Sequence, residues 1–106
     1  MLETLIASDH AGYGLKKNLV SNLKKEFKFL DLGPFSDKSV DYPDYAKKLS
    51  KKIETKNYDR GVLICGSGIG MSMVANRFES VRAALCMNEK MAKLAREHNN
   101  ASILVL

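Results

Sequence analysis

The sequence predicts a three-layer α/β/α sandwich around a five-stranded parallel sheet. Its 106 residues provide for one domain core. Short apolar runs alternate with segments whose apolar residues recur at helical spacing. One run, residues 62–65, has no polar position, which is typical of a strand buried on both faces. This alternation favours parallel strands joined by right-handed crossovers, in a single domain over residues 1–106.

The strands are predicted from apolar runs and the turn residues that follow them. The first run opens the chain, the second ends at the turn pair Gly33-Pro34, and the third ends at a glycine-rich turn. The fourth and fifth runs flank the last helical segment. The expected strands are residues 2–7, 27–32, 62–65, 82–86 and 102–106. Their alternation with helices predicts a Rossmann-like sheet.

Four helices are predicted between these strands. In the first, every fourth residue from Leu15 to Phe27 is apolar, and in the second, Pro43 suits a first turn, where a missing N–H costs nothing. The third follows the glycine turn, and the fourth covers residues 89–98. The side chains expected in the core are Leu15, Leu19, Leu23, Phe27, Tyr45, Ala46, Leu49, Ile53, Met71, Val74, Ala75 and Phe78, with Met73, Met87 and Met91 as further fillers.

The net charge of +5 raises the question of nucleic-acid binding. The lysines come in adjacent pairs between apolar residues at helical spacing, which predicts that each pair lies on the solvent side of a helix. No aromatic residue alternates with them, so the pattern disfavours nucleic acid and favours a small anionic substrate. The pairs are Lys16-Lys17, Lys24-Lys25, Lys47-Lys48 and Lys51-Lys52.

The composition predicts a cytoplasmic protein that does not enter membranes. The longest apolar run, residues 103–106, is too short to cross a bilayer. Glu3 and Asp9 interrupt the apolar stretch that a secretory leader would need. The two cysteines, Cys65 and Cys86, give neither a disulfide framework nor paired metal ligands, and neither a metal nor a cofactor is expected.

Two clusters of residues capable of chemistry follow expected strands. Ser8-Asp9-His10-Ala11-Gly12 comes after the first strand, and Cys65 with the glycine turn of residues 66–70 comes after the third. Ligands gather at the carboxyl ends of parallel strands, so both clusters line one crevice if these strands are neighbours. The turn offers N–H groups to an anion, but no lysine follows its glycines, and a nucleotide fingerprint is absent from the sequence.

Cys65 is the strongest catalytic candidate. It stands at a strand end beside a helix start, where a thiolate is favoured, whereas Cys86, which no glycine turn follows, is expected to be a small buried hydrophobe. His10 can turn its ring into the crevice or cap the first helix. His98 shares a helical face with Leu94 that is expected to point inward, so spacing alone favours a core or helix-end histidine.

Together these clusters resemble ribose-5-phosphate isomerase B and its relatives, the galactose-6-phosphate and allose-6-phosphate isomerases. The resemblance extends over all 106 residues and rests on five segments in the family's order and spacing. They are Ser8–Gly12, Asp41–Tyr45, Cys65–Ser72, Arg82–Cys86 and His98-Asn99. The family continues past the fifth strand into helices with phosphate-binding arginines, and residues 1–106 are expected to lack these helices.

The resemblance implies an aldose–ketose isomerase that interconverts ribose 5-phosphate and ribulose 5-phosphate through a cis-enediolate, in the pentose phosphate pathway. It implies that Cys65 moves the proton between C1 and C2, that His98 opens the sugar ring and that Asp9 assists at the ring oxygen. The implied substrate-binding residues are His10, Tyr42, Gly66, Ser67, Gly68, Ile69, Gly70 and Asn99. The alternatives are galactose-6-phosphate or allose-6-phosphate isomerisation and phosphosugar binding without catalysis.

His98 is predicted to reach the reaction from a second subunit. A helix over residues 89–98 runs antiparallel to the strands and spans about 15 Å, so its last turn lies at the opposite edge of the sheet from Cys65. One side chain cannot bridge that distance. We therefore expect a homodimer, or a dimer of such dimers, with two identical sites in each dimer. Cys65, Asp9 and His10 come from one subunit and His98 with Asn99 from its mate.

Overall fold

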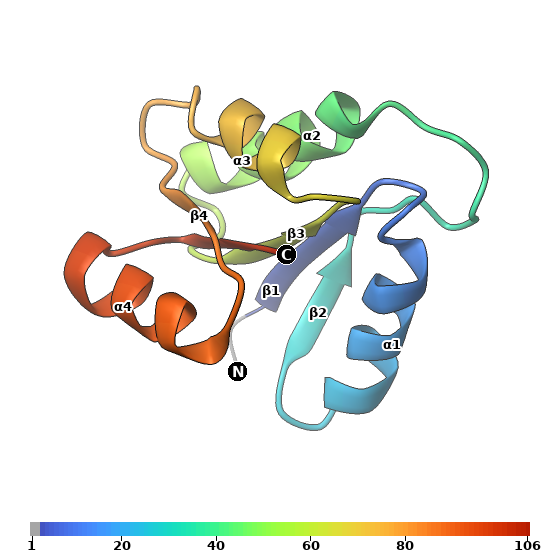
Figure 1. Ribbon diagram of the computed structural model, residues 1–106, viewed down its shortest axis with the longest axis horizontal. Coiled ribbons are helices and arrows are strands. Elements are labelled where there is room, and N and C mark those ends of the chain that lie inside the picture. The colour runs from blue at the N-terminus through green and yellow to red at the C-terminus, as the bar shows by residue number, and fades with distance from the viewer. Residues whose placement is uncertain (1–2) are drawn as a thin grey trace.

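Five parallel strands form the centre of the fold in the computed structural model, which describes residues 3–106 (Figure 1). The strands are β1 (Glu3–Ser8), β2 (Lys28–Asp31), β3 (Gly61–Ile64), β4 (Ala83–Leu85) and β5 (Ile103–Val105). The helices are α1 (Tyr13–Leu23), α2 (Tyr42–Glu54), α3 (Ile69–Ala75) and α4 (Glu89–Asn99). In Figure 1, α2 and α3 lie on one face of the sheet and α1 and α4 on the other. The predicted three-layer arrangement and element order are confirmed.

The strand order in the sheet is β2-β1-β3-β5-β4. β1 and β3 pair in parallel, and the Asp9 N–H just beyond β1 donates to the Ile64 carbonyl at the end of β3, at 3.0 Å. These two strands are therefore neighbours, which places the crevice of the sheet at their carboxyl ends. β5 is the last strand in sequence, yet it lies between β3 and β4 and pairs with both.

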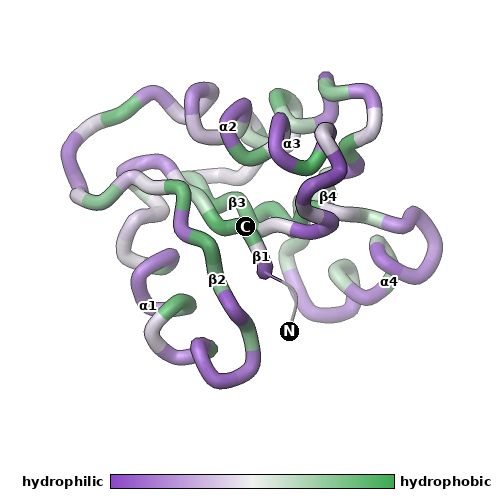
Figure 2. The backbone as a smooth tube through the Cα atoms, turned by 180° about the vertical axis from the view of Figure 1, so that it is seen from behind, coloured by the Kyte–Doolittle hydropathy of each residue, from purple (hydrophilic) through white to green (hydrophobic). Residues whose placement is uncertain are grey.

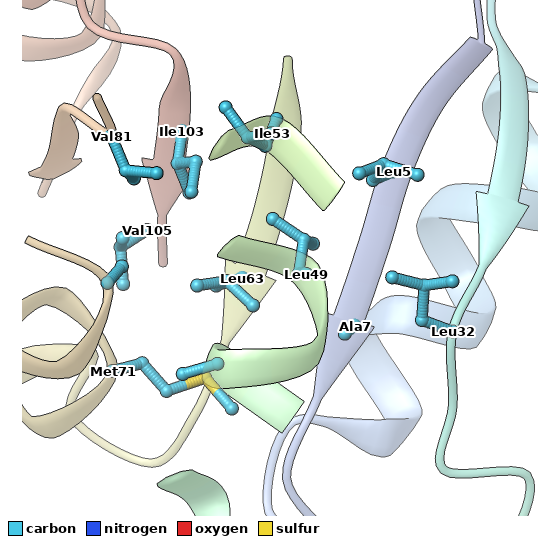
Figure 3. Packing of buried hydrophobic residues seen from close by; sticks show 12 residues of the cluster. Leu5, Ala7, Leu32, Leu49, Ile53, Leu63, Met71, Val81, Ile103 and Val105 are labelled. Carbon is cyan, nitrogen blue, oxygen red and sulfur yellow. The ribbon is translucent and has the colours of Figure 1, made fainter. Parts of the chain in front are cut away.

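The core lies between the sheet and the layer of α2 and α3 (Figure 3). Pro43 stands in the first turn of α2, as predicted, and Ala46, Leu49 and Ile53 turn the apolar side of this helix toward the strands. Burying a leucine side chain contributes about 1.5–3 kcal/mol to the stability of the fold, so the packing of this helix layer stabilises the central strands. The labelled core residues in Figure 3 are Leu5, Ala7, Leu32, Leu49, Ile53, Leu63, Met71, Val81, Ile103 and Val105.

Lys16 of α1 is buried, and the prediction that it faces solvent is wrong. Its exposed fraction is 1%, whereas that of Leu15, predicted to face the core, is 46%. The helix presents Lys16 to Asp31 at the end of β2, where Nζ lies 2.7 Å from the carboxylate. This pairing compensates the burial of the charge, which would otherwise be costly. The other lysine of the pair, Lys17, is exposed as predicted.

The apolar side of α4 lies at the protein surface rather than in the core. None of the residues of this helix is buried. Of the methionines predicted as core fillers, Met71 is buried and the other three are exposed. His98 is exposed in the last turn of α4, so of the two interpretations from spacing the helix-end histidine is confirmed and the core histidine is wrong. Helical spacing identifies an apolar face, but it does not say which neighbour covers that face. The exposed apolar side chains in and beside α3 and α4 are Ile69, Met73, Met87, Met91 and Leu94.

An open groove of about 320 Å³ lies along the sheet beside α4. Thr4, Val62 and Leu104 contribute to its lining from the strands, and Arg60 and Arg96 add charge. Seen from behind in Figure 2, hydrophobic residues follow the central strands, while α4 is mainly hydrophilic. Among residues 3–106, every helix is either too short or too polar to serve as a membrane span.

Candidate active site

The segments that follow β1 and β3 meet at one edge of the sheet. Ala11 Cβ lies 3.8 Å from the position that a Cβ on Gly66 would take. Gly12 approaches β3 more closely, because a Cβ there would lie 2.6 Å from the Ile64 carbonyl oxygen. A side chain at this position would push the start of α1 away from β3. The two clusters singled out in the sequence therefore form one site.

Cys65 stands at the carboxyl end of β3 and is partly exposed. Its sulfur accepts a hydrogen bond from the Gly68 N–H at 3.0 Å. The turn that brings this N–H back to the sulfur has a φ of +78° at Gly68, and a Cβ there would collide with the Leu85 side chain. A backbone donor of this kind stabilises negative charge on the sulfur, which is what a thiolate base needs.

The glycine turn packs against Tyr42, which stands at the start of α2. A Cβ on Gly70 would lie 2.6 Å from Tyr42 Cε1, so the tyrosine ring rests directly against the turn. Within the turn, Ser67 Oγ accepts the Ile69 N–H at 3.2 Å, while Gly66 and Ser67 are exposed. The structure thus brings Tyr42 and residues 66–70 together, although they come from separate segments of the chain.

Asp9 and His10 line the other side of the crevice and differ in environment. Asp9 is buried, and its Oδ1 accepts the Gly12 N–H at 2.8 Å, so this carboxylate fixes the segment between β1 and α1. His10 is exposed, and its Nδ1 accepts the Val40 N–H at 3.2 Å. A neutral His10 ring with Nδ1 as acceptor carries its proton on Nε2, where it can donate to a ligand. The sequence offered no signal for Val40, because a contact made by its backbone leaves no side-chain pattern.

His98 and Asn99 lie at the opposite edge of the sheet from Cys65. The Asn99 carbonyl accepts a hydrogen bond from Arg82 Nε at 2.6 Å, and Arg82 directly precedes β4. Ile103, just beyond α4, pairs with Gly61 at the start of β3, whereas Cys65 follows the end of that strand. The structure therefore brings nine residues of the predicted site together within one subunit and leaves His98 and Asn99 apart from them.

No group of three or more His, Cys, Asp or Glu side chains within residues 3–106 converges as metal ligands would. The ionisable groups of the crevice, Asp9, His10 and Cys65, each engage a backbone N–H instead. The arrangement suits acid–base chemistry by side chains, with backbone donors beside the reacting thiol.

Cys86 provides an internal comparison for the reactivity of Cys65. Cys86 is buried, as predicted, and its burial raises the pKa of the thiol above its usual value. The thiolate fraction of a cysteine falls about tenfold for each unit by which its pKa exceeds the ambient pH. We expect iodoacetamide to alkylate Cys65 at least about tenfold faster than Cys86 at neutral pH, because Cys65 is more accessible and has a backbone donor at its sulfur.

Mass spectrometry of the two cysteine peptides over a time course measures both rates in one sample. In a Cys86→Ala variant the labelling rate of Cys65 should be unchanged, which controls for distortion of the fold. Equal rates at the two cysteines, or faster labelling of Cys86, would contradict this account of the Cys65 environment.

Comparison with known proteins places this site in context. A family model described as Ribose/Galactose Isomerase matches residues 4–106. Ribose-5-P isomerase B of Listeria innocua is 40% identical over 106 residues, covering 99% of this chain and 72% of that protein. The ribose 5-phosphate isomerase structure from Thermotoga maritima is 51% identical, with a TM-score of 0.95, covering 99% of this chain and 73% of that one. The Mycoplasma genitalium ribose-5-phosphate isomerase B structure, which has bound ribulose-5-phosphate, is 46% identical, with a TM-score of 0.90, covering 99% of this chain and 71% of that one.

Proposed function

The chain belongs to the ribose/galactose isomerase family, and from this premise we propose that it interconverts ribose 5-phosphate and ribulose 5-phosphate. The observation that carries the proposal is the partly exposed Cys65 thiol, held by the Gly68 N–H at the carboxyl end of β3. Relatives named for this reaction, one of them with bound ribulose-5-phosphate, support the choice of a pentose phosphate. The chain would act in the cytoplasm, as an enzyme of the pentose phosphate pathway.

In this mechanism, the Cys65 thiolate removes the proton from C2 of the open-chain aldose. The electrons move into a C1–C2 double bond and leave negative charge on the oxygen at C1, which gives a cis-enediolate. Backbone N–H groups of the turn of residues 66–70, other than those of Gly68 and Ile69, which donate to Cys65 and Ser67, hold this charge as preorganised donors do. Cys65 returns its proton to C1 while the proton of the C2 hydroxyl passes to the oxygen at C1, so that C2 becomes a carbonyl and the product is the ketose.

The other site residues bind the substrate and open its ring. His10 donates from Nε2 to the phosphate, and Tyr42 and Ser67 flank the sugar. Asp9 uses Oδ1 to hold Gly12, which leaves the carboxylate Oδ2 to take the proton of the C1 hydroxyl beside the ring oxygen as the ring opens. His98 delivers the proton that opens the ring, and Asn99 holds a hydroxyl group.

We further propose that His98 and Asn99 come from the partner in a homodimer. Two sets of exposed apolar side chains support a shared site: Ile69 and Met73 beside the Cys65 turn, and Met91 and Leu94 on the helix that carries His98. A two-fold axis that packs the first set against the partner's second set buries both. It also sets each Cys65 opposite a His98, twice per dimer.

Incubation of the chain with ribose 5-phosphate, followed by detection of ribulose 5-phosphate by NMR, tests the proposal. We expect turnover that EDTA leaves unchanged, because the mechanism uses side chains alone. Galactose 6-phosphate and allose 6-phosphate, tested in parallel, distinguish the pentose from the hexose reaction. Binding of ribose 5-phosphate without ketose formation would refute isomerisation and favour a non-catalytic phosphosugar-binding domain.

A further inference from the structure

The buried charge of Lys16 has no part in the mechanism above. Its ammonium group makes three short contacts, to Asp31 Oδ1 at 2.7 Å, to Asp31 Oδ2 at 2.8 Å and to the Pro34 carbonyl oxygen at 2.8 Å. The three N–H donors of a lysine are thereby used completely. The rings of Tyr13 and Phe35 lie 5.5 Å and 5.2 Å from Nζ and add cation–π attraction.

These contacts fix the point where the chain leaves β2. Asp31 Oδ1, which accepts from Lys16, also accepts the Gly33 N–H at 2.8 Å. Through Asp31 and the Pro34 carbonyl, one side chain of α1 therefore anchors residues 31–34. The anchored residues begin the long loop that joins β2 to α2 (Figure 1).

The same loop ends at the active site. Residues 35–39 are exposed, and the Val40 N–H then donates to His10 Nδ1. Lys16 and His10 are themselves joined, because the Lys16 N–H donates to the Gly12 carbonyl at 2.9 Å and Gly12 is held by the carboxylate next to His10. The segment from residue 34 to residue 40 is thus held at both ends by residues at the start of α1. Lys16 binds the Pro34 carbonyl, and His10 accepts the Val40 N–H.

We infer that Lys16 is a positioning residue for His10: by anchoring Pro34, it holds the loop so that the Val40 N–H meets His10 Nδ1. This contact keeps the proton of the neutral ring on Nε2, ready for an anionic ligand. The ligand class, a sugar phosphate, rests on the proposed function, whereas the link between Lys16 and His10 does not. A lysine suits the position because its three donors reach a carboxylate and a carbonyl together.

The experiment compares the wild-type chain with Lys16→Met, the double variant Lys16→Met/Asp31→Asn, and Lys17→Met as a matched control on the exposed neighbour. The double variant avoids leaving Asp31 charged and unpaired, and its asparagine still accepts the Gly33 N–H. NMR measures amide exchange at Val40 and the ¹⁵N resonances of the His10 ring. The chain has two histidines, so His98 serves as the internal reference.

In folded Lys16→Met and in the double variant, we expect exchange at Val40 to accelerate by about tenfold or more. The His10 ring resonances should shift toward a mixture of tautomers, while those of His98 stay unchanged. For ribose 5-phosphate, KM should rise by about threefold or more with kcat within about twofold, as loss of ground-state binding requires. Lys17→Met should match the wild type throughout.

If the double variant has the wild-type rate of amide exchange at Val40 and the wild-type His10 resonances, the inference is overturned. Lys16 would then serve to pair with the charge of Asp31 and not to position His10. The NMR measurements need no turnover, so failure of the isomerase proposal and failure of this inference are separate outcomes. A KM change without any change at Val40 or His10 would also refute the inference, since the effect would then bypass the loop.

Discussion

A Cys65→Ala variant is expected to keep its fold and its affinity for ribose 5-phosphate while kcat/KM falls by about 10²–10⁴-fold or more, the usual contribution of a positioned base. The variant lacks the thiolate that is proposed to take the C2 proton, and the other cysteine, Cys86, is buried after β4, with β5 between that strand and β3. The structural cost is small, because the loss at the site is one sulfur hydrogen bond from Gly68, worth about 1 kcal/mol.

Proton exchange at C2 in D₂O measures the lost step directly, and calorimetry measures the retained binding. Cys65→Ser is the matched variant, because its hydroxyl can still accept from Gly68 but does not form the anion at neutral pH. It should be as inactive as Cys65→Ala, while Cys86→Ala stays active. Substantial C2 exchange in both Cys65 variants would show that another group is the base.

The second large effect is recovery of activity from two inactive chains. Cys65→Ala and His98→Ala are each expected to be inactive, and mixing them with subunit exchange should restore activity. A heterodimer contains one site with both residues intact and one with neither. Random exchange makes half of the dimers heterodimers, so we expect about a quarter of wild-type activity.

Differently sized tags and native mass spectrometry would verify that heterodimers form. The control mixes Cys65→Ala with a Cys65→Ala/His98→Ala chain, for which every site lacks the thiol and activity should not return. Heterodimers that form and stay inactive would place Cys65 and His98 in the same subunit's site. That outcome would contradict the shared-site arrangement while leaving the role of Cys65 intact.

Much of the fold follows from local pattern. The strand positions agree with the sequence to within one residue, and Pro43 in the first turn of α2 and the apolar side of this helix also agree, because each depends on residues close together in the chain. The meeting of Asp9 with the Cys65 turn was also predictable. It requires that β1 and β3 be neighbours, which parallel sheets of this kind commonly satisfy.

Other features depend on partners that lie far away in sequence. Lys16 looks like a solvent-facing residue, because periodicity counts any lysine as polar and cannot see Asp31 on another strand. The hydrogen bond from Val40 to His10 uses a backbone donor reached across a loop. Met91 and Leu94 form the apolar stripe that predicts a buried face, but within residues 3–106 the structure leaves this stripe at the surface.

The position of β5 in the sheet has a consequence for synthesis on the ribosome. β1, β2 and β3 can pair as they emerge, but β4 gains its neighbour in the sheet only when β5 follows. Leu106 then donates to the Leu63 carbonyl at 2.8 Å and accepts the Cys65 N–H at 3.2 Å. In the nascent chain, the Cys65 N–H therefore has no partner in the sheet until residue 106 pairs beside β3.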